Sequence, residues 1–364
     1  MARAQKITGP AFFIGKEGDG IISFGSGQPD LPPPKEIFRD LENPRLFKYG
    51  LIQGDKKLRE ALAGEYPCPP AGGAENFVIT NGASEALDLA MRVLAKMPGA
   101  NKILLCRPYY YSYPLIAEFA GIEPVYTQLK DGLIDLEDFA KKIKKVKAVL
   151  INSPSNPTGR VETMETLKAI ERITKKLGVW VISDEVYKDL IYGRENYLIK
   201  GRQVITINSF SKTYAMCGLR VGYLYSPDRQ FVQKITDMKV HTSMNTNSMG
   251  QAMALSAMRA PRSYVKKQVA IWERRRDLIY GGLIKLGFDL WKPEGAFYVL
   301  PKIKNAERAL GELYYKYKVI VYDGAWFGAP GRIRLSYALD EKKIEEGLNR
   351  IKKFLKGKES WLDF

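Results

Sequence analysis

The sequence predicts an α/β fold in which a large, mostly parallel sheet lies between helices, followed by a smaller α+β unit. Two observations predict it. Short apolar runs alternate with amphipathic helical segments through the middle of the chain, and polar clusters directly follow several of these runs. Such alternation is typical of parallel sheets covered on both faces. With 364 residues, the chain is long enough for about two domains.

The expected elements give the domain boundaries. We expect strands at 77–80, 102–106, 123–126, 148–151, 179–182, 204–207 and 222–225, and helices at about 84–96, 113–120 and 164–177. The last third suggests a helical stretch at 247–286 interrupted near Pro261, strands at 296–300, 319–322 and 332–336, and helices at 306–317 and 341–355. We therefore place a large domain at 41–250, a small domain at 251–364, and an N-terminal arm at 1–40 that crosses back to the small domain.

Composition narrows the class of protein. The chain is 45% hydrophobic and 27% charged, and no apolar run approaches the roughly 20 residues of a membrane span. We expect a cytoplasmic protein without a membrane partner. A single histidine, His241, and three cysteines without paired spacing argue against a Cys/His metal site, and we predict no bound metal. His241 lies in no catalytic motif, so we interpret it as a structural or surface residue.

The net charge of +17 raises the question of a polyanionic partner. The basic residues are mostly spread through helical segments. The densest run, 141–147, alternates with apolar residues and is interpreted as one solvated helix face. No nucleic-acid-reading motif accompanies it, and a regulator that binds DNA would need a further module, so we expect no nucleic-acid partner.

The most informative segment is 209–220, where Lys212 follows an apolar run. A lysine on the turn after a buried strand can form a Schiff base with a carbonyl if its surroundings lower the pKa of its amine. Nearby serines and Arg220 are groups that a phosphate requires. Together they suggest pyridoxal phosphate (PLP), although a basic surface turn would have the same local sequence.

Four polar clusters follow expected strands, at 81–84, 152–159, 183–185 and 209–212. In open α/β sheets, ligands bind beyond the carboxyl ends of the strands. The clusters should therefore meet in one cleft. This convergence supports the PLP hypothesis more strongly than any single motif does.

Each part of PLP has a candidate partner in these clusters. Gly82, Ala83 and Ser84 open a helix whose N-terminus favours an anion, and Ser209 and Arg220 would complete a phosphate site. Asp184 would pair with the pyridine nitrogen, Tyr187 and Asn156 would donate to the phenolic oxygen, Tyr110 would stack on the ring, and Arg334 would clamp a substrate carboxylate. Plainer roles remain open at this stage: Ser84 as a helix cap, Asp184 as a strand-end cap, Asn156 as a turn residue, Tyr110 in packing and Arg334 as an exposed strand residue.

Over nearly its whole length the chain resembles the class I/II (fold-type I) PLP-dependent aminotransferases. The matching stretches are GQPD 27–30, KYG 48–50, TNGASEAL 80–87, PYYYSY 108–113, NSPSNPTG 152–159, SDEVY 183–187, SFSK 209–212, GLRVG 218–222, GAFY 295–298 and RIRLS 332–336. Their order and spacing fit the family, and jointly they are specific for it.

The resemblance implies the roles just given. It also implies that Lys212 acts as general base and acid in a 1,3-proton shift. Gly27 and Asn156 would help Arg334 to hold the substrate, and Tyr49 would reach the phosphate of a neighbouring subunit, which implies a homodimer with shared sites. The implied activity is ping-pong transfer of an amino group between an L-amino acid, aspartate or an aromatic one, and a 2-oxo acid such as 2-oxoglutarate. A PLP-dependent C–S β-lyase or amino-acid decarboxylase is the alternative, because one fold hosts several reactions.

Three departures from the family pattern bear on specificity. The segment between Arg59 and Asn76 is shorter than usual, and Tyr110 takes a place that is often tryptophan. One prokaryotic aspartate-aminotransferase branch that this chain resembles has a lysine at the position of Ser84, where it helps to bind the distal carboxylate. Serine there argues against strict specificity for aspartate.

Overall fold

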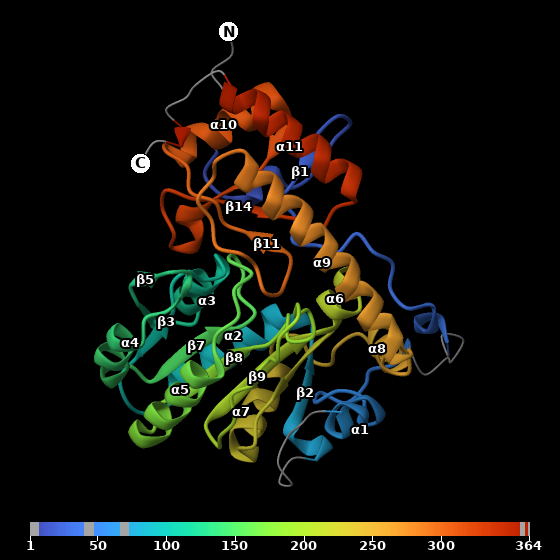
Figure 1. Ribbon diagram of the computed structural model, residues 1–364. Helices are drawn as coiled ribbons and strands as arrows, with labels where there is room; N and C mark the ends of the chain where they lie inside the picture. The colour runs from blue at the N-terminus through green and yellow to red at the C-terminus, as the bar shows by residue number, and fades with distance from the viewer. Residues whose placement is uncertain (1–6, 40–46, 66–72, 357–360, 363–364) are drawn as a thin grey trace.

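The computed structural model describes residues 7–39, 47–65, 73–356 and 361–362 (Figure 1). Cys68 and much of the short segment between Arg59 and Asn76 lie outside the described residues. The centre is a seven-stranded sheet in the order β2 (Phe77–Thr80), β10 (Gly222–Tyr225), β9 (Val204–Ser209), β8 (Trp180–Asp184), β7 (Ala148–Asn152), β3 (Lys102–Leu105) and β4 (Glu123–Tyr126). Strand β10 is antiparallel to both neighbours and the other pairs are parallel, which confirms the predicted α/β class.

Helices cover both faces of this sheet (Figure 1). On one face lie α2 (Gly82–Lys96), α3 (Ser112–Phe119) and α7 (Arg229–Val240). On the other lie α4 (Leu136–Lys142) and α5 (Met164–Leu177), with α1 (Lys56–Glu65) and α8 (Ser248–Met258) toward β2. Ile182 packs on the first face and its neighbour Val181 on the second, because successive strand side chains point to opposite faces.

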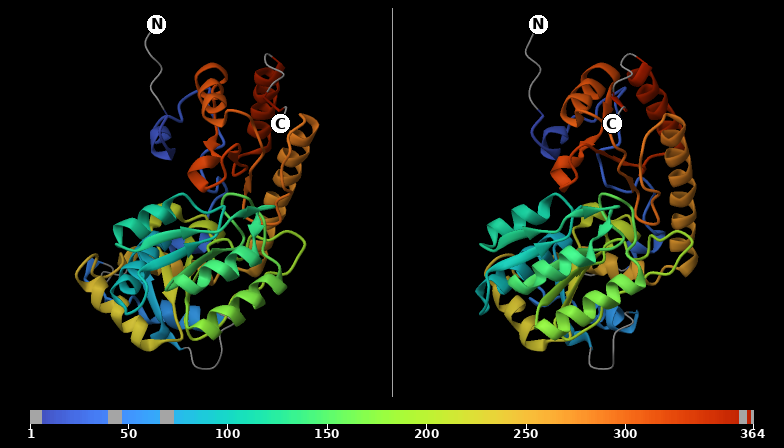
Figure 2. Two further views of the ribbon diagram at one scale, coloured as in Figure 1. Left: turned by 90° about the vertical axis from the view of Figure 1, so that its left-hand side faces the viewer. Right: turned by 60° about the vertical axis from the view of Figure 1, so that its left-hand side comes forward.

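The C-terminal elements gather above the sheet together with the N-terminal segment (Figure 2). A three-stranded antiparallel sheet of β11 (Tyr298–Val299), β14 (Ile333–Ser336) and β13 (Tyr322–Asp323) packs with α9 (Arg262–Lys285), α10 (Ala306–Tyr317) and α11 (Glu341–Lys356). Strand β1 (Ile22–Ser23) pairs in parallel with β12 (Val319–Ile320), so the two ends of the chain meet here. Strands β5 (Leu129–Lys130) and β6 (Leu133–Ile134) form a separate hairpin, and α6 (Phe210–Thr213) is a single turn after β9.

Strand register brings the polar clusters to one edge of the large sheet. Asn152 at the end of β7 pairs with Asp184 at the end of β8. On the other side, Gly222 of β10 pairs with Ser209 of β9 and with Thr80 of β2. The residues that follow these strand ends therefore lie side by side, as the strand-end rule predicts.

Several sequence predictions need correction. The basic run 141–147 is not one solvated helix face: it spans the end of α4 and a 3₁₀ turn, and Lys147 is buried. Its Nζ donates to the carbonyl of Leu94 at 2.8 Å and also bonds that of Met97, both at the end of α2. The expected strand 319–322 is two strands, because β12 pairs with β1 whereas β13 pairs with β14. The helix break near Pro261 is confirmed, since α8 ends at Met258 and α9 begins at Arg262.

No helix among the described residues combines the length and apolar character needed to cross a membrane.

Candidate active site

A cavity of about 340 Å³ lies between the polar edge of the large sheet and the C-terminal unit. Most of the predicted site residues line it. They are Gly27, Ala83, Ser84, Tyr110, Asn156, Asp184, Tyr187, Ser209, Lys212, Arg220 and Arg334. Two predicted residues are not in its lining: Gly82, which lies directly against Arg220, and Tyr49, which is 84% exposed.

Lys212 projects from α6 into this cavity, where protein groups surround its amine. Its Nζ donates to the carbonyl oxygen of Gly27 at 2.7 Å. Burial lowers the pKa of Lys212, and the charges of Arg334 and Arg220 act in the same direction. A side chain at position 27 would collide with Tyr298, since a Cβ there would lie 2.3 Å from its hydroxyl oxygen. The amine is thus held by a neutral partner, and the lowered pKa makes its nucleophilic, uncharged form more accessible than that of an exposed lysine.

Asp184, 4% exposed, presents a carboxylate at the floor of the cavity. Its Oδ2 accepts from the Tyr113 hydroxyl at 2.7 Å and its Oδ1 from the backbone N–H of Val186 at 3.3 Å. Burial raises the pKa of Asp184 to about 6, although both hydrogen bonds favour the ionised form. The carboxyl group thus has two donors beside it and lines the cavity, where its anion could bind a cationic ring nitrogen.

Three further side chains with donor groups, those of Tyr187, Tyr298 and Asn156, line the cavity. The hydroxyl oxygens of Tyr187 and Tyr298 lie 2.8 Å apart, and burial raises the pKa of both phenols, that of Tyr298 to about 12. The backbone of Asn156 is held in place by its neighbour, because its N–H donates to Asn152 Oδ1 at 2.8 Å. Asn152 in turn donates to the Asp184 carbonyl at 3.0 Å, which ties β7 to β8 at the site.

The start of α2 and Arg220 form a cup for an anion, here called the anion cup (Gly82, Ala83, Ser84 and Arg220). Gly82 has a φ of +76°, and a Cβ there would lie 2.5 Å from Arg220 Nη2, so only glycine allows the guanidinium to come so close. The first N–H groups of a helix have no intrahelical acceptor, and Ala83 and Ser84 line the cavity. The geometry suits a phosphate.

Ser209 has a second task that the sequence did not reveal. Its Oγ accepts from the Ser211 backbone N–H at 3.0 Å and so caps α6, the turn that carries Lys212. The same oxygen lies 2.8 Å from Ser211 Oγ and 3.1 Å from the Val221 carbonyl. Ser211 also lines the cavity and adds a hydroxyl that the sequence prediction missed.

Arg334 on β14 is 2% exposed, so the interpretation as an exposed strand arginine is wrong. Its guanidinium lies between the rings of Tyr298, Tyr322 and Phe327, with centroids 4.6 to 4.8 Å away. Nη1 donates to Asn156 Oδ1 at 3.1 Å, and Nη2 donates to the Gly25 carbonyl. Its buried Nε has no hydrogen-bond partner among the described residues, so the group retains capacity for a carboxylate ligand.

The sequence matches the family described as "Aminotransferase class I and II" over residues 19–351. The chain belongs to this family. A relative named "Probable aspartate/prephenate aminotransferase", from Aquifex aeolicus, is 35% identical over 374 residues, covering 96% of this chain and 94% of the relative. The "Aromatic-amino-acid aminotransferase 2" of Thermococcus litoralis is 32% identical, covering 93% of each chain. The solved "aspartate aminotransferase from Thermus thermophilus with maleate" superposes with a TM-score of 0.89 at 28% identity, covering 96% of this chain and 97% of that one.

Other lining residues of this aminotransferase were not assigned a role from the sequence. Tyr113, on α3, follows Tyr110 by three residues across the turn that begins the helix, and that spacing could have placed it beside the same ligand. Tyr111 and Tyr322 add two more rings to the cavity wall. Tyr111 lies in the matching stretch 108–113, whereas no local pattern marks Tyr322. Tyr110 itself contacts Tyr111 and Tyr113, with ring centroids 4.7 and 5.4 Å away.

His241, interpreted from the sequence as a structural or surface residue, lies outside the site, whereas Cys217 lines the cavity. His241 is exposed at the end of α7 and is not part of the cavity lining. Cys106 and Cys217 are free cysteines. Within the described part of this aminotransferase, no three His, Cys, Asp or Glu side chains gather in a way that could hold a metal ion.

Proposed function

We propose that this protein is a PLP-dependent aminotransferase that moves an amino group between an L-amino acid and a 2-oxo acid in two successive half-reactions. One observation carries the proposal. The amine of Lys212, whose pKa burial lowers, shares a cavity with a carboxylate, an anion cup and a guanidinium that lacks a carboxylate partner. PLP and an amino acid together present the complementary groups.

The residues present fit the cofactor. The phosphate belongs in the anion cup, where the missing Cβ of Gly82 leaves the Arg220 guanidinium beside the start of α2. Asp184 would face the ring nitrogen, and Asn156 and Tyr187 would donate to the phenolic oxygen. Tyr110 would cover the ring, and Ser209 would support the phosphate site through its contacts with Ser211.

When bound, PLP supplies an electron-withdrawing ring that stabilises negative charge developing at the α-carbon of the substrate. The protein supplies the remaining parts. Lys212 would carry the cofactor on its amine and would later take the proton from the substrate α-carbon as a general base, a task that a lowered pKa favours. Arg334, with Gly27 and Asn156 beside it, holds the α-carboxylate so that the Cα–H bond faces Lys212.

The cavity wall supports an aromatic amino acid as the preferred donor. Lys212, Arg220 and Arg334 are the cationic side chains among the described lining residues, and each already has a task in the proposal. None remains for a side-chain carboxylate, whereas Tyr110, Tyr111, Tyr298 and Tyr322 offer rings. We propose a broad pocket with aromatic preference and 2-oxoglutarate as the acceptor, whose distal carboxylate would accept hydrogen bonds from neutral groups such as the tyrosine hydroxyls.

A homodimer is part of the proposal, because Tyr49 is exposed and does not line the cavity of its own chain. It lies in an exposed apolar region formed by Phe38, Phe47, Tyr49, Leu51, Met244 and Met249. Ser248 Oγ bonds the Lys48 carbonyl at 3.4 Å and joins the two segments that carry these residues. A second copy covering this region would bring Tyr49 to the partner's phosphate. A monomer by sedimentation at micromolar concentration would contradict this part.

The test is a panel of amino donors with 2-oxoglutarate, combined with a single half-reaction. An aminotransferase incubated with donor alone releases about one 2-oxo acid per active site, without ammonia. We expect aromatic donors to give the highest kcat/KM. Continuous release of ammonia or carbon dioxide would point to a lyase or a decarboxylase and would overturn the proposal.

A further inference from the structure

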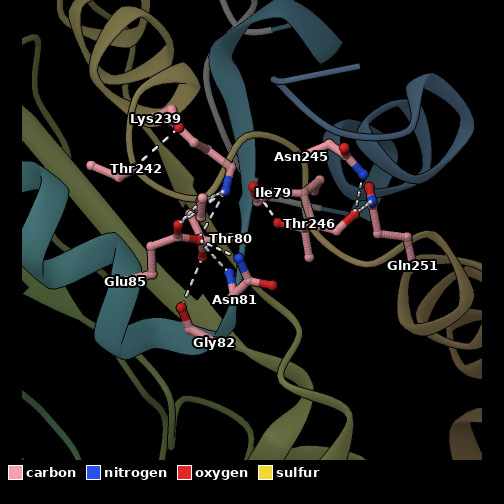
Figure 3. Close-up of polar contacts among 11 residues, drawn as sticks. Ile79, Thr80, Asn81, Gly82, Glu85, Lys239, Thr242, Asn245, Thr246 and Gln251 are labelled. Atoms are coloured by element: carbon pink, nitrogen blue, oxygen red, sulfur yellow. Dashed lines mark hydrogen bonds and ion pairs between the residues drawn. The ribbon is translucent and has the colours of Figure 1, made fainter. Parts of the chain in front are cut away.

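The fully buried Lys239 and the partly buried Glu85 form an ion pair close to Asn81 and Gly82 (Figure 3). Neither residue lines the cavity. Lys239, on α7, is 0% exposed, and its Nζ lies 3.1 and 3.0 Å from the two carboxylate oxygens of Glu85. The same Nζ donates to Ser243 Oγ at 2.6 Å, and that hydroxyl donates to Glu85 Oε1. A fully buried lysine needs such a partner, so the group is a built feature of the interior.

Glu85 connects this pair to the turn that begins the anion cup. Its Oε2 accepts from the backbone N–H of Asn81 at 2.5 Å and from Asn81 Nδ2 at 3.2 Å. Asn81 is the N-cap residue of α2, yet its own side chain makes no capping hydrogen bond. The carboxylate of Glu85 therefore takes over the task of fixing the residue directly before Gly82.

The loop after α7 holds the rest of the cup. Thr246 Oγ1 donates to the Ile79 carbonyl at 3.0 Å, on the strand that leads into Asn81 (Figure 3). Asn247 Nδ2 donates to the Leu219 carbonyl at 3.1 Å, on the residue before Arg220. Lys239 and the loop that follows it thus hold both the helix start and the arginine of the cup.

The charges of this group matter because Glu85 lies one turn into α2. The negative charge of an unpaired carboxylate there would offset the positive potential of the helix N-terminus. It would also repel a phosphate bound at the same end. Lys239 compensates it from the far side, where the amine cannot reach the ligand. The cup then keeps the positive potential of the helix start and of Arg220.

We infer that Lys239 and Glu85 are positioning residues for the cofactor phosphate: they fix the Asn81–Gly82 turn, and Lys239 cancels the charge of Glu85. The inference rests on the proposed cofactor. It predicts an effect that depends on the phosphate, which a merely structural role would not produce. Pyridoxal, which has the ring and aldehyde of PLP without its phosphate, is the probe that separates the two.

The experiment measures the affinity of Lys239→Met for PLP and for pyridoxal, after the cofactor is removed from the holoenzyme. We expect PLP to bind about tenfold more weakly or worse, with pyridoxal affinity within about twofold of wild type. Inorganic phosphate should also compete less well with PLP. The double variant Glu85→Gln/Lys239→Met should regain much of the lost PLP affinity, because it has no uncompensated carboxylate.

Lys147→Met is the matched control. Lys147 is also buried and holds the opposite end of α2 through the carbonyls of Leu94 and Met97. Its replacement should lower thermal stability while leaving the ratio of PLP to pyridoxal affinity unchanged.

Three results would overturn the inference: equal losses for PLP and pyridoxal in Lys239→Met, the same preferential loss in Lys147→Met, or unchanged PLP affinity in Lys239→Met. If Lys239→Met does not fold, the charge-neutral double variant and Ser243→Ala carry the test. Ser243→Ala should weaken the binding of PLP more than that of pyridoxal. The double variant should change the two affinities to the same extent. Failure of the wild-type protein to bind PLP would contradict the proposed cofactor instead.

Discussion

Lys212 and Lys239 both point into the protein near the anion cup, and their surroundings are opposite. Lys239 Nζ contacts both oxygens of a carboxylate and a hydroxyl, whereas Lys212 Nζ donates to the carbonyl of Gly27 and has arginines nearby. Burial lowers the pKa of both amines, but Glu85 raises that of Lys239. The direct contact with Glu85 therefore distinguishes Lys239, which is held in an ion pair, from Lys212, whose amine bonds a neutral carbonyl.

The comparison also predicts opposite effects on stability. An amine enclosed without a carboxylate destabilises the folded protein at pH values where the unfolded chain is protonated. An amine paired with a buried carboxylate leaves an unpaired charge behind when it is removed. Loss of the amine is therefore expected to leave stability unchanged or higher at Lys212, where it abolishes function, and to lower stability at Lys239.

The largest effect is expected for Lys212→Ala. Loss of the amine removes both the attachment of the cofactor and the proton transfer, so kcat should fall by about 10⁴-fold or more. The cofactor-free variant should be at least as stable to heat as the cofactor-free wild type. Lys239→Met is the control, because it should lower the melting temperature while retaining measurable turnover. A lowered melting temperature in Lys212→Ala together with loss of turnover in Lys239→Met would contradict the contrast between the two lysines.

The second largest effect is expected at Asp184, the carboxylate proposed to face the ring nitrogen of the cofactor that Lys212 would carry. Asp184→Asn should lower kcat by about 10² to 10³-fold, because a neutral amide stabilises a cationic ring nitrogen poorly. Its pKa is raised by burial from 3.8 to about 6, so the folded protein holds the proton more tightly than the unfolded chain does between those values. The free energy of unfolding therefore falls as pH rises through this window.

Denaturant unfolding of the cofactor-free proteins tests this sign. Asp184→Asn should equal wild type below about pH 4 and be more stable above pH 6, by at most about 3 kcal/mol. A variant that is less stable than wild type at pH 8 would show that the carboxylate stabilises the fold, contrary to the account.

A smaller effect is expected at Arg334. Arg334→Ala should raise KM by about 100-fold for every donor with a free α-carboxylate, and leave the KM of amino-acid amides unchanged. Its positive charge also lowers the pKa of Lys212, so the pKa of the free amine should rise in the variant. Arg334→Lys keeps the charge and should retain the pKa shift while losing the two-pronged geometry. An increase in KM confined to dicarboxylic donors would show that Arg334 binds the side chain.

The smallest effect is expected for Tyr113→Phe. The Tyr113 hydroxyl lowers the pKa of Asp184 by hydrogen bonding its anion, so its loss should move the pKa of Asp184 upward from about 6. The acid limb of the kcat/KM profile should shift to higher pH, with a loss of only a few-fold at pH 8. An unshifted acid limb would remove Asp184 as its cause.

Local patterns carried most of what the sequence could predict. The residues after strand ends, from Ser84 to Lys212, could be placed because register in a parallel sheet brings strand ends together. The pairing of Lys239 with Glu85 joins residues 154 apart in the chain, and nothing in either segment marks the partner. The prediction that Lys147 lies on a solvated helix face was wrong for a similar reason. Its burial depends on the end of α2, which lies 50 or more residues away in the chain.

Whether Lys212 carries the cofactor is tested most directly by reducing the holoenzyme with borohydride and mapping the labelled peptide. Reduction links the cofactor permanently to the lysine that carries it. We expect the pyridoxyl group on Lys212, at about one per chain, with Lys239 unlabelled. Label on Lys239 or spread over surface lysines, with Lys212 unmodified, would contradict it.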